Sequence, residues 1–398
     1  MTGPSPGRLR RYAAKCFALE SYLRSPGDGR RFPQIPAPTL LWSLLVSRLL
    51  RAPAYHAVEG LVRSPARRAL EVERAFGDDA VAYFTERLDP GPTRRAHAAV
   101  LRRAKRNKAF DDTTWIVVVL DGTGGARCRA APCPLCHPSY DSEGEVVSYF
   151  HRLSLLTIVA GDWVLPADGE LYGPGDSEVT TSARLLQRAV GHLGRRFADC
   201  VVLDAEYAGA PFLHLVGELG LPVVARLKDN LPELSNAARA RFEGQPPITT
   251  VVENGERIEL WDADDFEPWG DLNWLSVRVL RYRQYHRNGK VTEAYWLTNL
   301  SPRRAGSRIL FRLCKSRWCI ENQGFNDAKN RYGLEHMAHH HPNSLLIDLL
   351  LLCLALTLER LYRLRYLRRG HHAPYTAVAF CRLLWISLGR SPVLFDTS

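Results

Sequence analysis

The sequence predicts an α/β fold in which a helical region comes first and a β-rich insertion divides a sheet-based core. Two apolar runs carry this prediction, WIVVVLD at 115–121 and CVVLD at 200–204, because both are rich in β-branched residues and both end in an aspartate. Such continuous runs are typical of strands buried on both faces of a sheet. The composition agrees, since 398 residues, 46% hydrophobic and 24% charged, can build two or three domains and exclude a disordered chain.

Residues 1–110 are predicted to form a helical, DNA-binding region. Their apolar residues recur at three- and four-residue spacing, as in LLWSLLVSRLL at 40–50, and Pro and Gly residues at 26–27, 33–38 and 90–92 divide the segment. A basic run leads from this region into the core and is a candidate for contact with nucleic-acid phosphates. It contains Arg102, Arg103, Lys105, Arg106 and Lys108.

Residues 111–229 are predicted to form the first part of the core. Its elements are strands at 115–121, 146–150 and 153–159, a helix at 180–193, a strand at 200–204, a helix at 210–219 and a strand at 222–228. This order of elements is that of a ribonuclease-H-like fold. Asp121 and Asp204 close two of the strands, and open α/β sheets bind their ligands at the carboxyl ends of strands.

Residues 230–300 are predicted to be a β-rich insertion, because apolar and polar residues alternate and turn signals such as Asn254-Gly255 separate the runs. Residues 301–370 would complete the core with a helix that carries Glu321, and residues 371–398 would form a C-terminal tail.

The apolar stretch at 345–358 is interrupted by Asp348. A membrane span needs about 20 apolar residues. We therefore interpret this stretch as a buried core helix and expect no membrane association.

Charge is distributed unevenly along the chain. Residues 1–110 hold 21 Lys and Arg against 9 Asp and Glu, residues 111–300 hold 17 against 27, and residues 301–370 hold 13 against 5. Basic segments on either side of an acidic centre suit a polyanion such as DNA, and carboxylates suit divalent cations. A solvated surface that happens to be basic explains the flanks equally well.

The cysteine content indicates the cellular compartment. Nine cysteines, an odd number spread over a long chain, favour a reducing environment over a disulfide framework. The basic N-terminal residues are not followed by the apolar segment of a secretory signal. We therefore expect a cytoplasmic protein.

Three carboxylates from separate elements are the candidates for catalysis. A phosphodiester is attacked in line by an oxygen nucleophile, and two divalent cations about 3.5–4 Å apart hold the attacking and leaving oxygens. Such cations need oxygen ligands, which Asp121, Asp204 and Glu321 would supply. In the alternative interpretation each Asp is a turn or cap residue, and Glu321 forms an exposed helical ion pair with Arg317, four residues earlier.

Three segments resemble a known family. LDGT at 120–123, LDAEY at 203–207 and RWCIENQGFNDAKNRYGLEH at 317–336 are similar to the catalytic segments of the DDE transposases of bacterial insertion sequences. The branch is the one with a β-rich insertion between the second Asp and the Glu. The likeness covers residues 115–360, and its third segment is the most specific.

The resemblance implies a metal-dependent DNA transposase that hydrolyses element ends and then joins the freed 3′-OH to target DNA. Asp121, Asp204 and Glu321 would hold two Mg²⁺ or Mn²⁺ ions, and Arg317 and Lys329 would grip the phosphates beside the cleavage site. Its partners would be double-stranded DNA, as element ends and as target, and a second copy of the chain that holds the other end. Such a protein would work at the nucleoid in the bacterial cytoplasm.

The sequence departs from the family at two positions. The family often has a Tyr three residues before the Arg, where this chain has Cys314, so the resemblance does not extend to hairpin-forming end chemistry. The family's Lys commonly falls seven residues after the Glu, whereas Lys329 falls eight after Glu321. Phe325 is displaced by the same single residue, which indicates a local variant.

A group of cysteines and histidines with zinc-like spacing follows the first aspartate. It consists of Cys128, Cys133, Cys136, His137 and His151. Thiolates and imidazoles are ligands that zinc prefers, but free thiols in a loop are an equal alternative. Three further histidines at 339–341 are interpreted as a solvated loop, because adjacent side chains point in different directions.

Two other functions fit the same residues. One is a DNA-binding protein descended from a transposase that no longer cleaves, although the presence of both Asp and the Glu argues against it. The other is a ribonuclease-H-like nuclease without a strand-transfer step, which the β-rich insertion and the segment around Glu321 disfavour.

Overall fold

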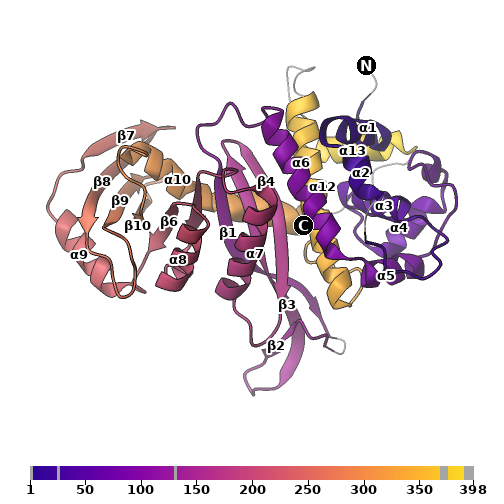
Figure 1. Cartoon of the computed structure of the whole chain (residues 1–398), viewed down its shortest axis with the longest axis horizontal. Helices are drawn as coiled ribbons and strands as arrows, with labels where there is room; N and C mark the ends of the chain where they lie inside the picture. Colours follow the sequence, from indigo (N-terminus) through magenta and orange to yellow (C-terminus); the bar gives the residue numbers. More distant parts are fainter. Residues whose placement is uncertain (1–2, 25–26, 130–131, 368–374, 390–398) are drawn as a thin grey trace.

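The computed structural model describes residues 3–24, 27–129, 132–367 and 375–389. A ten-stranded mixed sheet runs through the molecule, and the N-terminal helices gather at one end of it (Figure 1). The predicted α/β class with a helical N-terminal region is therefore confirmed.

The helical elements are α1 (Pro6–Phe17), α2 (Leu19–Leu23), α3 (Ala37–Leu49), α4 (Tyr55–Val62), η1 (Pro65–Arg68), α5 (Asp78–Arg87), α6 (Pro90–Arg106), α7 (Glu178–Leu193), η2 (Ala205–Tyr207), α8 (Ala210–Glu218), α9 (Pro232–Phe242), α10 (Ser307–Cys319), η3 (Ile320–Phe325), α11 (Asn326–Tyr332), α12 (Pro342–Arg360), η4 (Leu361–Leu367) and α13 (Ala377–Ser387). The strands are β1 (Val117–Cys128), β2 (Cys136–Tyr140), β3 (Val146–Ala160), β4 (Trp163–Tyr172), β5 (Cys200–Leu203), β6 (Val223–Leu227), β7 (Thr249–Glu253), β8 (Glu256–Phe266), β9 (Val277–Tyr285) and β10 (Val291–Thr298).

The core of the sheet has the strand order β4-β3-β1-β5-β6. Strand β1 pairs antiparallel with β3 and parallel with β5, and β5 pairs parallel with β6. This order and these directions are those of a ribonuclease-H-like core, as predicted.

Three details of the predicted core are wrong. The runs at 146–150 and 153–159 form the single strand β3, and the third strand of the core is β4, which the sequence pattern did not predict. Pro166, Asp168 and Gly169 interrupt the apolar pattern of β4. Strand β2, which pairs with the first half of β3, was also missed.

The strands of residues 230–300 extend the core sheet and do not form a separate one. Strand β10 pairs antiparallel with β6, and β9, β8 and β7 follow outward as an antiparallel meander. Without β10, the backbone donors and acceptors along β6 would lie at an open edge. The insertion therefore completes the hydrogen bonding of the core.

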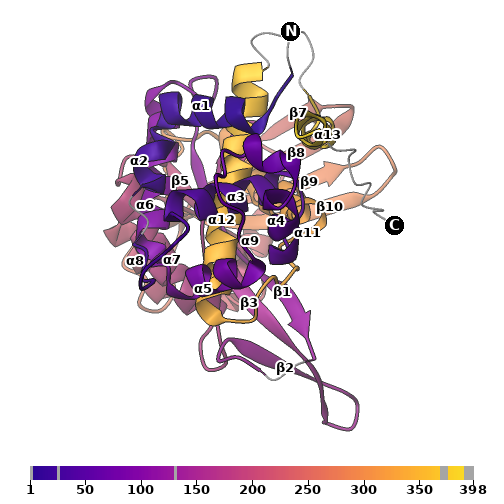
Figure 2. The same cartoon turned by 90° about the vertical axis from the view of Figure 1, so that its right-hand side faces the viewer.

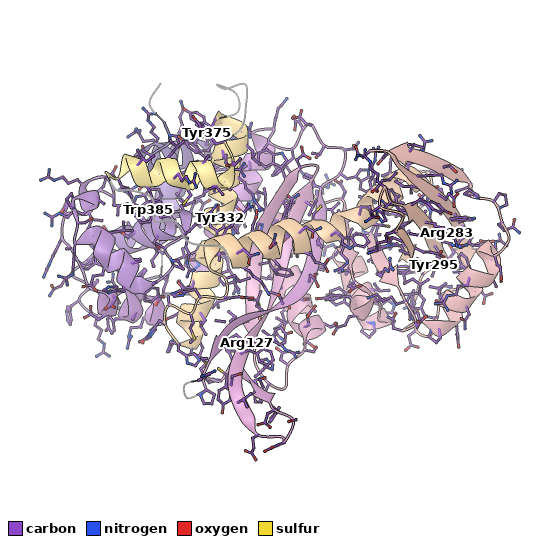
Figure 3. The ribbon with its side chains drawn as sticks, turned by 180° about the vertical axis from the view of Figure 1, so that it is seen from behind. Arg127, Arg283, Tyr295, Tyr332, Tyr375 and Trp385 are labelled. Carbon is purple, nitrogen blue, oxygen red and sulfur yellow. The ribbon has the colours of Figure 1, made fainter. Side chains whose placement is uncertain are left out.

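Alternate residues of β1 enter two hydrophobic cores, one on each face of the sheet. Val118 and Leu120 share a core with α7 and α8, whereas Val117 and Val119 share one with α10. Helices α7 and α8 lie in front of the sheet in Figure 1. Helix α10 crosses the opposite face, which is the face turned toward the viewer in Figure 3. Because side chains alternate along a strand, the face of α10 is also the face of Asp121.

A buried ion pair fixes the start of α10 against the insertion strands. Arg278 on β9 donates from Nε to Oδ1 of Asp262 on β8 (2.7 Å), and from Nη1 to the carbonyl of Ala305 (2.7 Å). Ser307, the first residue of α10, donates its hydroxyl to the same Asp262 carboxylate (2.6 Å). The insertion strands therefore help to position the helix that leads to Glu321.

Helix α12 is the predicted buried helix and runs between the sheet and the N-terminal helices (Figure 2). Asp348, which interrupts its apolar pattern, pairs with Arg48 on α3 (Oδ1–Nη2, 3.1 Å). Within the described residues, no helix is long and apolar enough to cross a bilayer. The segment predicted as a tail contains α13, where Nε1 of Trp385 donates to the carbonyl of Leu50 (3.0 Å).

Candidate active site

Asp121 lies within strand β1. The antiparallel pairing of β1 with β3 continues through Asp121, opposite Leu155, so the prediction that Asp121 closes its strand is wrong. The parallel pairing with β5 stops at Val119. On the side of β1 that faces β5, Asp121 therefore lies two residues beyond Val119, the last residue paired with β5.

Asp204 directly follows β5 and caps the short helix η2, as its position at a strand end predicts. Its carboxylate accepts the backbone N–H of Ala205 (2.8 Å) and lies 3.3 Å from Nζ of Lys228, which follows β6. Because β1 and β5 are adjacent and parallel, Asp121 and Asp204 lie at the same edge of the paired region.

Arg317 joins the third carboxylate to the first. Its Nη2 donates to Oε1 of Glu321 (2.7 Å), and its Nη1 donates to Oδ2 of Asp121 (3.2 Å). The side chains of Arg317 and Asp121 are only 12% and 16% exposed, and that of Glu321 is 42% exposed. The pair of Arg317 and Glu321 is therefore not the isolated surface ion pair of the alternative interpretation.

Glu321 belongs to a π-helical segment, η3, that lies between α10 and α11 without a break in the helix. The backbone N–H of Asn326 reaches the carbonyl of Glu321, a bond of the i→i+5 type that encloses one residue more than an α-helical bond. This π-helical turn lies between Glu321 and Lys329, which are eight residues apart. The departure from the family spacing thus coincides with a π-helical turn, which is common at functional sites.

Glu178, the first residue of α7, is a fourth carboxylate at this place. Its Oε1 accepts the hydroxyl of Tyr207 (2.7 Å), and a Cβ added at Gly122 would lie 1.9 Å from its Oε2. Only glycine beside Asp121 leaves room for this carboxylate. The sequence offered one signal, an acidic residue in the first turn after the GPG turn at 173–175, but a favourable helix dipole explains such a residue equally well.

The electrostatics of the site reflect an excess of negative charge. Burial raises the pKa of Asp121 to about 7 against the opposing charge of Arg317, and the charges of Glu178, Glu321 and Asp204 raise it further. Burial also raises the pKa of Glu178. Burial alone would raise the pKa of Asp204 as well, but the N–H of Ala205 and the charges of Arg317 and Lys228 hold it below its ordinary value.

These residues fit divalent cations. By type, the carboxylates of Asp121, Asp204, Glu321 and Glu178 are the hard oxygen ligands that Mg²⁺ and Mn²⁺ prefer, although within the described residues no three of them have oxygens all within 4.8 Å of one another. Burial and, to a smaller extent, the neighbouring carboxylates raise the pKa of Asp121, and a bound cation would favour its ionised form.

Of the predicted phosphate-contacting residues in the third segment, Arg317 faces the carboxylates, whereas Lys329 forms an ion pair with Glu335 (Nζ–Oε1, 3.0 Å). Arg360 of α12 donates to the carbonyl of Gln323 (2.9 Å) and to Asp327 (2.9 Å), and so fixes η3 and α11 from the other side.

The basic run at 102–108 forms the end of α6 and the turn after it. Part of it lines a surface groove of about 530 Å³. The groove residues are Arg102, Lys105, Arg106, Leu193, Gly194, Arg196 and Phe197. Lys105 is already engaged, because its Nζ donates to the carbonyls of Arg196 (2.9 Å) and Phe197 (2.7 Å). Arg102, Arg106 and Lys108 are exposed, and Arg103 is partly exposed.

The cysteine and histidine group differs from the predicted set. Cys133, Cys136 and His151 come together with His340, which was predicted to lie in a solvated loop. His137 instead meets the carbonyl of Tyr172 through Nε2 (2.9 Å). Cys128 is not one of the four residues, although its Sγ lies 4.0 Å from Nε2 of His340. The solvated-loop prediction for 339–341 is wrong, because His339 pairs with Glu86 (2.9 Å) and Nδ1 of His341 accepts the N–H of Asn343.

Comparison with known proteins gives a family match. A model described as the transposase DDE domain matches residues 138–358, a range that includes Asp204 and Glu321 and begins after Asp121. A cryo-EM structure of a piggyBac transposase synaptic complex with hairpin DNA is similar in fold, with 11% sequence identity and a TM-score of 0.48, over 96% of this chain and 80% of that one. No curated protein matches the sequence.

Proposed function

Because the chain belongs to the family of transposase DDE domains, we propose that it is a DNA transposase of the kind that bacterial insertion sequences encode. It hydrolyses the phosphodiester at the ends of its element and joins the freed 3′-OH to target DNA in the bacterial cytoplasm. The observation that supports this most is the pair of hydrogen bonds that Arg317 makes to Asp121 and Glu321, with Asp204 near enough for its charge to raise the pKa of Arg317.

Asp121, Asp204 and Glu321 are the residues that hold the catalytic cations, with Glu178 beside them. Two Mg²⁺ or Mn²⁺ ions held by these residues would supply Lewis-acid stabilisation of the charge that develops during phosphodiester cleavage. The protein contributes a rigid arrangement, because the carboxylates come from a strand, a strand end and a helix that packs across the sheet.

Arg317 neutralises the carboxylates and positions the phosphate. A guanidinium has five N–H donors, of which Arg317 uses one for Asp121 and one for Glu321. Its planar fork suits a phosphate oxygen as well as a carboxylate. Its side chain is mostly buried, so its charge acts with little screening by solvent.

The DNA partner binds through sequence-independent phosphate contacts at the basic groove beside α6, supplemented by Arg317 and Lys329. Arg102, Arg106 and Arg196 are the exposed cations among the residues that line the groove. A second copy of the chain holds the other element end, so that two ends are cut and joined together.

The test is cleavage and joining of DNA that carries the element ends, which the genomic sequence on either side of the reading frame identifies as inverted repeats. Wild-type protein with Mg²⁺ is expected to nick the end and to join it to target DNA. Asp121→Asn should abolish both steps and leave DNA binding nearly unchanged. Asp162→Asn, an exposed aspartate in the turn between β3 and β4, is the matched control and should behave as wild type.

Each alternative function gives a different result. Wild-type protein that binds the ends and never nicks them would identify a DNA-binding protein without catalytic activity. Cut ends with no joined product would identify a nuclease.

A further inference from the structure

Four side chains from three segments bring their ligand atoms together at the base of the β2–β3 hairpin. Sγ of Cys136 lies 3.8 Å from Sγ of Cys133, 3.4 Å from Nε2 of His151 and 3.3 Å from Nε2 of His340. Sγ of Cys133 also lies 3.4 Å from Nε2 of His151, and all four atoms lie within 4.8 Å of one another. The two cysteines are free thiols, since a disulfide bond would be about 2.05 Å long.

These spacings are the edges of a tetrahedron around a zinc ion. With Zn–S of about 2.3 Å and Zn–N of about 2.0–2.1 Å, the edges measure about 3.8 Å between two sulfurs and about 3.5 Å between sulfur and nitrogen. The observed distances of 3.8, 3.4 and 3.3 Å agree with them closely. Hydrogen bonding is an incomplete explanation, because a thiol has one proton to donate and Cys136 makes three contacts.

We propose that Cys133, Cys136, His151 and His340 bind one Zn²⁺ ion. Two thiolates and two imidazoles suit zinc and not the hard cations of the carboxylate site. The shell has four protein ligands and no open position, so the ion is structural. Binding releases the two thiol protons, because both sulfurs coordinate as thiolates.

The surroundings of the four residues support this assignment. Nδ1 of His151 lies 3.2 Å from the carbonyl of Ala126, which fixes the proton on Nδ1 and leaves the lone pair of Nε2 toward the sulfurs. The N–H of Cys136 donates to the carbonyl of Cys133 (3.0 Å), which closes the turn between the two cysteines. Cys136 and His151 are also directly opposite each other in the pairing of β2 with β3.

The ion would join segments that are far apart in the sequence. Cys133 lies in the connection from β1 to β2, and Cys136 is the first residue of β2. His151 lies on β3, and His340 lies in the connection between α11 and α12. The last of these follows the helix that carries Glu321 and Lys329. The zinc therefore ties the far end of that helix to the sheet.

The same turn lies against the loop that leads to the fourth carboxylate. A Cβ added at Gly173 would lie 2.5 Å from the carbonyl of Pro134, so the turn between the cysteines packs tightly on the start of the loop before Glu178. The hairpin itself projects from the molecule (Figure 2), and its tip around 140–147 is exposed. A two-stranded ribbon is only marginally stable alone, so a metal at its base would stabilise it.

Zinc content of the purified full-length chain tests the proposal without reference to activity. Wild-type protein prepared without chelator is expected to hold about one zinc per chain. His340→Asn should weaken zinc affinity by more than the 10- to 100-fold that loss of an outer-shell partner costs. His341→Asn is the matched control, because it changes the next residue of the same loop and should leave the zinc content unchanged. Cys16→Ser, a partly buried free thiol on α1, is the corresponding control for Cys133→Ser.

Cobalt substitution keeps the test decisive if a variant does not fold. Wild-type protein stripped of zinc and titrated with Co²⁺ should show the intense visible bands of a tetrahedral site together with thiolate-to-cobalt charge transfer, saturating at one equivalent. Absence of zinc from the wild type together with absence of these bands would overturn the proposal, as would equal zinc loss in Cys16→Ser and His340→Asn. Because neither readout involves DNA, failure here and failure of the proposed transposase activity are distinguishable.

Discussion

Arg317 on α10 and Asp121 on β1 are 196 residues apart in the chain, yet Nη1 of the arginine lies 3.2 Å from Oδ2 of the aspartate. The same guanidinium holds Glu321, so one cation links the strand and the helix of the site. This link fixes the position of α10 relative to β1 at the site of the proposed chemistry.

Replacement of Arg317 by Gln is expected to reduce cleavage of end DNA by about 10²-fold or more, since the loss of one positioned donor at a developing charge has this effect. Arg317→Lys should fall between Gln and wild type, because it keeps the charge and loses the planar fork. Single-turnover cleavage at saturating DNA measures the effect. Arg312→Gln, at a 70% exposed position of the same helix, is the control and should cleave as wild type does.

Glu178→Gln is expected to weaken Mn²⁺ binding by about 10- to 100-fold, the usual cost of losing a group that supports a metal site. The amide oxygen of Gln can still accept the hydroxyl of Tyr207, so packing is retained. Calorimetric titration of the protein with Mn²⁺ in the absence of DNA measures the affinity. Tyr207→Phe separates the two roles of Glu178, because it removes the hydrogen bond and keeps the carboxylate. If the Gln variant bound Mn²⁺ as tightly as wild type, Glu178 would have no part in the cation site.

The double variant Arg102→Gln, Arg106→Gln should bind DNA more weakly and with a smaller dependence on salt. Each lost phosphate contact lowers the slope of log K against log salt concentration by about one unit. Lys105→Gln should leave the slope unchanged and lower the free energy of unfolding, because its ammonium is bonded to the carbonyls of Arg196 and Phe197. Binding isotherms at several salt concentrations decide between these outcomes. An unaltered slope in the double variant would mean that DNA does not enter the groove.

His97 is expected to make the protein sensitive to acid. It is 2% exposed on α6, its Nε2 meets the hydroxyl of Thr357 on α12 (2.9 Å), and burial lowers its pKa from 6.5 to about 3. The fold therefore keeps His97 neutral while the unfolded chain takes up a proton below about pH 6.5. Its contribution to stability is complete above that pH and falls as the pH drops toward about 3, by about 1.4 kcal/mol per pH unit.

His97→Gln should remove that part of the pH dependence, as measured by urea unfolding between pH 4 and pH 7. His56→Gln, at an exposed position on α4, is the control and should retain the wild-type slope. Equal slopes in His97→Gln and wild type would show that another group takes up the proton.

Local sequence patterns predicted the parts of the fold that depend on local order. The apolar runs before Asp121 and Asp204 are strands, and the helical spacing around Glu321 is a helix. Strand β4 was missed because Pro166, Asp168 and Gly169 interrupt its pattern, although it pairs with β3 on both sides of a register shift at Leu156/Thr157. Local patterns do not indicate which strands pair with each other, so the pairing of β10 with β6 was not predicted.

For the candidate site as well, local patterns identified some residues and missed those whose role depends on distant parts of the chain. Asp121, Asp204 and Glu321 were found because each stands in a segment with a distinctive pattern. Glu178 was passed over because an acid in the first turn of a helix has an ordinary explanation, and only the space above Gly122 shows where it points. His340 was assigned to a solvated loop because nothing local distinguishes it from its neighbours, and its role depends on a turn about 200 residues earlier in the chain.

The pairing of β10 with β6 has a consequence for synthesis of the protein on the ribosome. The nascent chain releases β6 first and then the whole meander from β7 to β9 before β10 can cover the exposed edge. Until that moment the half-made polypeptide offers a bare strand to any other unfinished chain nearby, which is the usual route to aggregates. The meander itself consists of neighbouring strands and can assemble early, so that its last strand docks as soon as it emerges.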